Sequence, residues 1–488
     1  MRFFCPFGAK RLVNEPSDKV LRLLSYTIGL LFLLVSCQGW REPKEVSAEM
    51  PPVFPDYTEV TIPRNIAPLN FMVRDAQHVQ AVLTNDKGVM MKVQGDDVIR
   101  MDIEEWRSLT RDEGKVRVEV SVWDEQHPDG LLYAPFMIHV VKDEVDPYIV
   151  YRLLPPGYEG WNKMGIYQRN LSNFEVTTVM DNSDDRETCM NCHAFNQHSP
   201  KDMSMHVRGP QGTTVIRRGG KEELVNLPEM AGGRHGSLAS WHPSSRYIAF
   251  SCNDTKQIFY GRSQDKIEAF DVKSDLYIYD VEHHRSILDE RFTSSDQWET
   301  FPAFSPDGKW LYFSVAKPIH MPQEYQQLHY SLVRAPFDEQ SGKLGDVDTV
   351  YNAGISGGTA LMPRISPDGR YLLCTMSESG AFNLYHKESD FMMLDLQSRE
   401  LVDCSPINSL EAESYHAWSS NGKWLIYSSK QVDGRYTRLF LSHWDGKQWG
   451  KPFMLPLEDP WQNTLMMMAY NVAEFVKDSV EPVTLDKK

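Results

Sequence analysis

Apolar and polar residues alternate in short runs along much of the chain, which is the pattern of β-strands that bury one face. Between residues 59 and 150, runs such as VQAVLTN, KVRVEVSVW and FMIHVVK are separated by turn sequences such as NDKG and HPDG. Several short strands at this spacing predict a small β-sandwich over residues 59–150. The segment IEEWRSL in this region has the pattern of a helical turn.

A strand–turn–strand pattern repeats four times in the second half of the chain. The copies WHPSSRYIAFS, FSPDGKWLYFS, ISPDGRYLLCT and WSSNGKWLIYS occupy residues 241–251, 304–314, 365–375 and 418–428. Turn-forming residues fill the middle of each copy, and a Lys or Arg followed by an aromatic residue opens the second strand. A third and a fourth strand follow, as in DLYIYDV and RSILD. Four strands per unit of about 60 residues predict the blades of a β-propeller.

The repeated motif resembles the WD40-like PD40 repeat of TolB-type proteins over residues 235–456. Weaker patterns predict two more blades. Strand-like runs at 164–181 and at 469–476 are expected to form one blade from both ends of the chain, and residues 186–230 form the other. The sequence therefore predicts an all-β protein, in which a six-bladed TolB-like β-propeller over residues 160–478 follows the small β-sandwich.

The N-terminus has the order of basic and apolar residues that is typical of a secretory signal. The apolar run LRLLSYTIGLLFLLVS is too short for a comfortable membrane span. It ends at Cys37 in the sequence LVSC, which resembles the lipobox of bacterial lipoproteins and implies a lipid on Cys37 after removal of a signal peptide within residues 1–37. A plain signal peptide with an incidental cysteine is the alternative. The proline-rich residues 38–58 are expected to form a tether.

Export and charge limit the classes of partner. A lipoprotein of this kind is expected in the periplasm or anchored to the outer membrane of a Gram-negative bacterium. The net charge of −16 argues against a nucleic-acid partner, because phosphate binding needs a basic face. Three scattered cysteines, Cys252, Cys374 and Cys404, are expected to be buried as small apolar side chains.

The most specific chemical signal is the Cys-x-x-Cys-His sequence formed by Cys189, Cys192 and His193. It resembles the haem-attachment motif of c-type cytochromes, in which two thiols add across the haem vinyl groups and the histidine binds the iron. The resemblance implies one covalent haem c on Cys189 and Cys192, with His193 as the proximal ligand. The expected export agrees, because haem c is attached outside the inner membrane.

Three alternatives stay open at the sequence level: a static disulfide, a redox disulfide, and a zinc site completed by His198 and His206. For a distal iron ligand we favour His206 over Met203. If residues 203–208 form a strand, Met203 shares one face with Met205, and His206 points the other way. Because an extended strand would turn the two cysteines to opposite sides, a helical turn is expected over residues 185–193.

The starts of the inner strands supply further binding candidates at the channel mouth: Arg234, His235, Glu299, Thr359, Glu413 and His416. Channel mouths are polar in any propeller, so these residues carry a weaker signal than the cysteine motif. We expect haem over the mouth, with Cys192 near the propeller axis and Arg234, His235 or Glu413 within reach of the propionates.

The function predicted from the sequence is that of an exported lipoprotein propeller with one haem c, which serves electron transfer or redox signalling to a membrane-associated protein partner. A haem-free TolB-like interaction scaffold is the alternative. No carboxylates are paired at a convincing catalytic spacing, so an electron carrier or binding protein is favoured over an enzyme.

Overall fold

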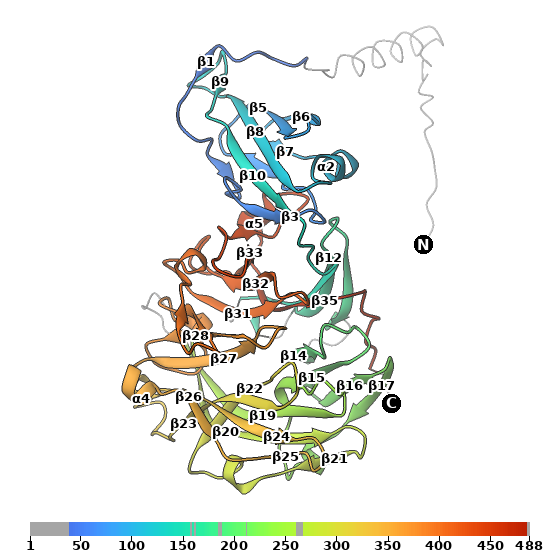
Figure 1. Ribbon diagram of the computed structural model, residues 1–488, viewed down its shortest axis with the longest axis vertical. Coiled ribbons are helices and arrows are strands. Elements are labelled where there is room, and N and C mark those ends of the chain that lie inside the picture. The colour runs from blue at the N-terminus through green and yellow to red at the C-terminus, as the bar shows by residue number, and fades with distance from the viewer. Residues whose placement is uncertain are drawn as a thin grey trace, which may run out of the picture.

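The computed structural model describes residues 39–156, 159–160, 163–183, 188–210, 212–259 and 267–485. The expected signal peptide and Cys37 lie outside these residues. Within the described ranges, no helix is long and apolar enough to cross a membrane. Figure 1 shows two parts, a smaller N-terminal one drawn in blue and a larger one that contains the rest of the chain.

The N-terminal part is a β-sandwich of a seven-stranded and a three-stranded sheet. The strands of the larger sheet are β1 (Glu45–Val46), β3 (Thr61–Pro63), β5 (His78–Asn85), β6 (Met90–Gly95), β8 (Gly114–Trp123), β9 (Leu131–Leu132) and β10 (Phe136–Val141). The smaller sheet contains β2 (Val53–Phe54), β4 (Phe71–Val73) and β7 (Val98–Ile99). The expected helical turn is α2 (Ile103–Leu109), which Asp102 caps by accepting hydrogen bonds from the backbone of Glu104 and Glu105.

The segment expected to be a tether is largely part of this sandwich. Strand β1 pairs with β9, and β2 pairs with β4. Tyr57 is buried, and its hydroxyl donates to the Met454 carbonyl of the propeller at 3.3 Å. The expectation over residues 38–58 was therefore wrong from Glu45 onward. The prolines indicated a linker, but Val53 and Tyr57 are buried. Burial of these apolar side chains stabilises the folded segment, whereas an extended tether would leave them exposed to water.

The larger part is a propeller of six sheets, numbered here as blades 1 to 6 from the N-terminal side. Blades 1 to 3 contain β35 (Ala469–Val476), β11 (Tyr148–Leu154), β12 (Gly165–Asn170) and β13 (Val176–Asp181); β14 (Cys189–Phe195), β15 (Met203–Arg208), β16 (Thr213–Arg218) and β17 (Lys221–Val225); and β18 (Ser237–Trp241), β19 (Tyr247–Phe259), β20 (Ile267–Asp280) and β21 (Arg285–Ile287).

Blades 4 to 6 follow in chain order. They contain β22 (Trp298–Phe304), β23 (Trp310–Ala316), β24 (Ser331–Asp338), β25 (Lys343–Leu344) and β26 (Asp348–Tyr351); β27 (Thr359–Ile365), β28 (Tyr371–Ser377), β29 (Asp390–Asp395) and β30 (Leu401–Val402); and β31 (Glu413–Trp418), β32 (Trp424–Ser429), β33 (Arg438–His443) and β34 (Phe453–Met454). The short helices are α3 (Leu227–Met230), α4 (Ala353–Ser356), α5 (Gln462–Leu465), η2 (Glu290–Phe292), η3 (Tyr325–Gln327), η4 (Asn383–Tyr385) and η5 (Ser405–Ile407).

Blade 1 is built from both ends of the propeller sequence. The C-terminal strand β35 is its innermost strand and pairs antiparallel with β11. Each inner strand contacts the inner strand of the next blade, and β35 contacts both β14 and β31, so the ring is closed. The propeller begins at Tyr148, earlier than the expected residue 160, because β11 is a propeller strand and not the end of the sandwich.

The inner strand of every blade contains one residue in the left-handed region of backbone space. These residues are Cys192, Leu238, Phe301, Met362, Tyr415 and Val472, with φ between 42° and 55°. At each of them the pairing with the second strand shifts register, which is a β-bulge. A bulge redirects side chains, and all six of these residues line the cavity at the centre of the ring.

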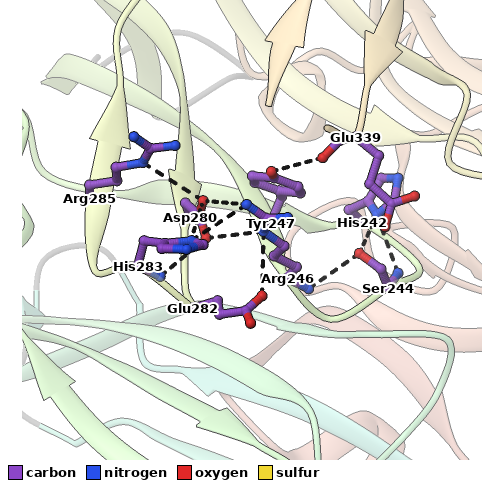
Figure 2. Close-up of polar contacts among 9 residues, drawn as sticks. All are labelled: His242, Ser244, Arg246, Tyr247, Asp280, Glu282, His283, Arg285 and Glu339. Atoms are coloured by element: carbon purple, nitrogen blue, oxygen red, sulfur yellow. Dashed lines mark hydrogen bonds and ion pairs between the residues drawn. The ribbon is translucent and has the colours of Figure 1, made fainter. Parts of the chain in front are cut away.

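In blades 4, 5 and 6 the turn between the first two strands is held by a serine and an acid or amide two residues later. Ser305 donates to Asp307 at 2.7 Å and accepts from the backbone of Trp310. In blade 3, His242 and Ser244 take these places, with Nδ1 and Oγ separated by 2.7 Å (Figure 2).

The basic and aromatic residues that open the second strand have separate partners. Arg246 pairs with Asp280 on β20 at 3.1 Å, and Arg370 pairs with Asp395 on β29 at 2.8 Å. The Tyr247 hydroxyl donates to the Glu339 carbonyl of blade 4 at 2.9 Å (Figure 2). The arginines therefore fix the blade internally, and the tyrosine joins it to the next blade.

One apolar core runs from the sandwich into the propeller. It includes Val118 of β8, Phe71 of β4, and Ile426 and Leu439 of blade 6. The Trp424 indole adds a hydrogen bond to the Asp143 carbonyl at 2.8 Å. An interface that is apolar and continuous with both cores holds two domains in one fixed arrangement.

We predict that Gly308→Ala destabilises the protein more than Gly369→Ala does. Both glycines occupy the same turn position with φ of 71° and 74°, so each alanine pays the left-handed backbone penalty of roughly 1–2 kcal/mol. At Gly308 a Cβ would also collide with the His242 ring, whereas at Gly369 it meets nothing within 4 Å. Thermal unfolding of both variants checks this, and equal losses would contradict it.

Candidate functional site

The centre of the propeller holds a cavity of about 1230 Å³, lined by the inner strands of all six blades. Small-molecule sites usually measure about 300–1,000 Å³, so this volume suffices for a large ligand. Part of the wall comes from the long β19–β20 hairpin, through Asn253 and Ala269, and from Tyr385 beside it. A buried pair between Glu268 and His386, 3.2 Å apart, joins the hairpin to the η4 segment.

The Cys-x-x-Cys-His motif lies on β14, the innermost strand of blade 2. Cys189, Cys192 and His193 all contribute to the cavity wall. Residues 189–193 are strand and not the helical turn expected over 185–193, of which residues 185–187 lie outside the described chain. The bulge at Cys192 interrupts the alternation of the strand, so both thiols border the cavity without a helix.

Both cysteines of the motif are buried, free thiols. Arg152 Nη2 lies 3.3 Å from the Cys189 sulfur. Burial raises the pKa of the Cys192 thiol, and the cations Arg208 and Arg152 oppose that rise in part. Redox-active thiols usually have a lowered pKa, so this setting does not favour the redox-disulfide alternative.

His193 is the least satisfied polar side chain of the motif. It is 2% exposed, and neither ring nitrogen makes a well-formed hydrogen bond. Burial lowers its pKa to about 4, although the nearby backbone of Val150 and Val472 acts in the opposite direction. The imidazole is therefore neutral near pH 7, which is the form that binds a metal.

A second histidine occupies the equivalent place in blade 6. His416 follows the bulge residue Tyr415 just as His193 follows Cys192. The His416 Nε2 atom is 3.1 Å from the Leu373 carbonyl of the neighbouring blade. A histidine at this place can thus serve blade packing, whereas neither ring nitrogen of His193 makes a well-formed hydrogen bond.

The two expected distal ligands do not line the cavity. Strand β15 has the predicted faces: Met203 lies with Met205 in the core between blades 1 and 2, whereas His206 stacks on His235, with ring centroids 5.8 Å apart. Neither is therefore brought to His193. The sequence could not decide whether Met203 or His206 reaches the cavity, because the answer depends on which face of blade 2 each neighbouring blade covers.

The ligands of the alternative zinc site are also separated. His198 Nδ1 lies 3.1 Å from the Phe475 carbonyl, in the loop after β14. Among the described residues, no group of three or more His, Cys, Asp or Glu side chains could hold a metal ion. The zinc interpretation therefore lacks the cluster that it needs.

Of the six residues expected at the channel mouth, only His416 lines the cavity. Arg234 pairs with Asp275 at 2.6 Å, and Thr359 accepts from the backbone of Tyr330 at 2.8 Å. Glu299, Thr359 and Glu413 precede the bulge of their strands and are buried outside the cavity wall, because residues before the bulge face the neighbouring sheet and not the axis.

Two of these residues are buried carboxyls. Glu299 is fully buried, and neither carboxylate oxygen has a hydrogen-bond partner, so burial raises its pKa to about 8. Burial also raises the pKa of Glu413, to about 7, although Ser409 and Ser429 donate to its Oε1 at 2.7 and 2.8 Å. Both groups affect stability more directly than binding.

Three arginines of the cavity wall were missed at the sequence level: Arg152 on β11, Arg208 on β15 and Arg364 on β27. Their signal was weak. Arg152 interrupts the apolar run YIVYRLL, and a buried position for a cation in such a strand is unusual.

The letters GISGG at residues 354–358 match a Gly-x-Ser-x-Gly motif. In the structure they overlap the one-turn helix α4, which follows the outer strand β26. No histidine of the described chain is hydrogen-bonded to Ser356, so the segment is not a nucleophile elbow.

No protein-family model matches the chain, and no curated protein matches it. The chain shows weak likeness to many solved structures, including the following three. Tricorn protease is 12% identical with a TM-score of 0.27 over 68% of this chain and 35% of that one. A puromycin-hydrolysing peptidase of Mycobacterium tuberculosis is 10% identical with a TM-score of 0.35, covering 84% of this chain and 57% of that one. The periplasmic gluconolactonase of Pseudomonas aeruginosa is 14% identical with a TM-score of 0.33, covering 63% and 96%.

The chain thus spans about a third of the length of tricorn protease and just over half that of the peptidase. The propeller assignment rests on the order of its own sheets, which is that of six blades around one axis.

We predict that Glu299→Gln changes how stability depends on pH. A carboxyl whose pKa is raised on folding to about 8 contributes stability that is present below its unfolded pKa and lost as pH rises through 8. The unfolding temperature of the wild type should therefore fall relative to that of the variant between pH 5 and pH 9. The exposed Glu400→Gln is the control, and a pH-independent difference for Glu299→Gln would contradict the prediction.

Proposed function

We propose that this protein is an exported lipoprotein that carries one haem c in the central cavity of its propeller, for electron transfer to a membrane-associated protein partner. The observation that carries the proposal is the joint position of Cys189, Cys192 and His193 on the cavity wall. Two thiols and an adjacent imidazole are the groups that covalent haem attachment requires.

The unpartnered imidazole of His193 supports the proposal. A buried polar group without a hydrogen bond costs roughly 1–3 kcal/mol, and a ligand that bonds to the group removes that cost. Neither nitrogen of His193 makes a well-formed hydrogen bond, although the backbone of Val150 and Val472 lies near, while Nε2 of the equivalent His416 is bonded to a carbonyl. An iron ligand role would satisfy one nitrogen of His193.

The cavity also suits a flat apolar ring. Leu238, Phe301 and Met362 form apolar parts of the wall, opposite or beside the cysteine strand. Its volume of about 1230 Å³ exceeds that of typical small-molecule sites. Bound haem c supplies one-electron oxidation and reduction, and an apolar surround helps to set its potential.

The wall includes exposed residues as well as buried ones. Lys387 and Arg435 line the cavity and are exposed, so the site opens to solvent on their side. An opening of this kind would let a protein partner approach the cofactor. The lipid on Cys37 would keep the protein at a membrane, which is why the expected partner is membrane-associated.

We predict that denatured protein, produced with haem-attachment machinery, keeps its colour on a gel stained for haem peroxidase activity. Cys189→Ala together with Cys192→Ala should abolish the stain, because both thioether bonds are lost. Cys374→Ala removes an equally buried thiol outside the motif and serves as the control. A colourless wild type would overturn the haem proposal and leave the haem-free scaffold.

We also predict that His193→Ala keeps covalently bound haem but changes its absorption spectrum, since the proximal ligand is lost while both thiols remain. Added imidazole should restore the spectrum in part. His242→Ala removes a buried histidine of the blade 3 turn and should lower the unfolding temperature without a spectral change. An unaltered spectrum for His193→Ala would show that this histidine only packs against blade 1.

A further inference from the structure

Three arginines of the cavity wall come from three different blades. Arg152 belongs to blade 1, Arg208 to blade 2 and Arg364 to blade 5. Within the part of the chain that the structure describes, none of the three forms an ion pair with a carboxylate, although Arg364 lies near enough to the buried Glu474 to act against the rise in the pKa of that carboxyl. Other arginines of the propeller do have one, such as Arg217 with Glu222 at 2.6 Å.

Arg152 shows that this lack of a counter-charge is costly. It is 8% exposed, and its guanidinium donates to Asn191 Oδ1 at 2.9 Å and contacts the sulfurs of Met164 and Cys189. None of these partners is anionic, and Nε has no partner. A buried cation without a carboxylate is unfavourable, so an anion bound in the cavity would stabilise Arg152.

The charge of the wall differs from that of the protein. The chain carries a net charge of −16, yet the cavity is lined by six basic side chains and only two acidic ones: Arg152, Arg208, Arg364, Lys387, Lys430 and Arg435 against Glu411 and Asp433. One of the two acids, Glu411, is already paired with Lys387 at 3.0 Å. A cleft lined by one sign of charge concentrates ligands of the opposite sign.

We propose that Arg152, Arg208 and Arg364 bind carboxylate groups inside the central cavity. The planar guanidinium fork matches a carboxylate in bidentate geometry. Blades 2 and 5 face each other in a ring of six, so Arg208 and Arg364 approach from opposite walls. Cations on opposite walls suit a ligand with several separated carboxylates better than one compact anion.

Two sources could supply these carboxylates. The first rests on the proposed function: haem has two propionates, on the side of the ring away from the vinyl groups. Thioether bonds on blade 2 would direct the propionates toward Arg364 on blade 5. The second source is a free polycarboxylate that enters the cavity. Both sources present carboxylates to the arginines. They differ in which arginine contributes most to binding.

The test uses full-length protein with Arg152→Gln, Arg208→Gln or Arg364→Gln, and with the exposed Arg399→Gln as the matched control. Thermal unfolding first shows which variants fold. In the first arm, redox titration of the haem-loaded protein gives the midpoint potential at several pH values. In the second arm, calorimetry measures citrate binding to the colourless Cys189→Ala, Cys192→Ala protein and to its arginine variants.

If propionates are the source, Arg364→Gln lowers the midpoint potential and raises the pH at which the potential changes slope, because a cation near a carboxylate is lost. Haem-loaded protein then does not bind citrate. If a free polycarboxylate is the source, citrate binds whether or not haem is attached, and each arginine variant weakens binding at least tenfold.

The proposal is overturned if neither the potential nor citrate binding responds to the three variants more than to Arg399→Gln. A colourless wild type would overturn the proposed haem function alone. The citrate arm would still decide the carboxylate site in that case, so the two failures are distinguishable.

Discussion

The closed ring of inner strands depends on one backbone feature, a left-handed residue that interrupts each inner strand. All six inner strands are bulged at that residue, where their pairing with the second strand shifts register. The bulge removes one step of the alternation and directs one side chain per blade to the axis. In five blades that side chain is Leu238, Phe301, Met362, Tyr415 or Val472, and in blade 2 it is Cys192.

This placement gives the cysteine motif its chemical setting. An uninterrupted strand would have turned Cys189 and Cys192 to opposite faces, and only the bulge lets both reach the cavity. The same bulge positions His193 against blade 1, where neither ring nitrogen makes a well-formed hydrogen bond. A propeller can therefore present such a motif without the helix on which it was expected.

Several buried polar groups along the inner strands are unsatisfied, and they differ in meaning. Glu299 lies between blades, away from the cavity. Its unsatisfied carboxyl therefore affects the stability of the fold, and this effect depends on pH. His193 and Arg152 border the cavity, where a ligand can satisfy them. An unsatisfied group away from the cavity thus only destabilises the fold, whereas one that borders the cavity can belong to a binding site.

The sequence by itself determined the features that depend on local pattern. The Pro-Asp-Gly turns and the alternation around them predicted the regular blades, and the unmatched strand-like runs at the two ends predicted their union in blade 1, since an unpaired strand edge must find a partner. The faces of β15 followed from the period of two alone, with Met203 and His206 on opposite sides.

Only the tertiary structure decided what depends on contacts between distant segments. Residues 45–58 read as a tether because prolines are a local signal, whereas the burial of Tyr57 requires blade 6 to be in place. The arginines of the cavity wall are 56 and 156 residues apart along the chain, between Arg152 and Arg208 and between Arg208 and Arg364. No local pattern links them, because closure of the ring, rather than sequence spacing, brings blades 1, 2 and 5 to one axis.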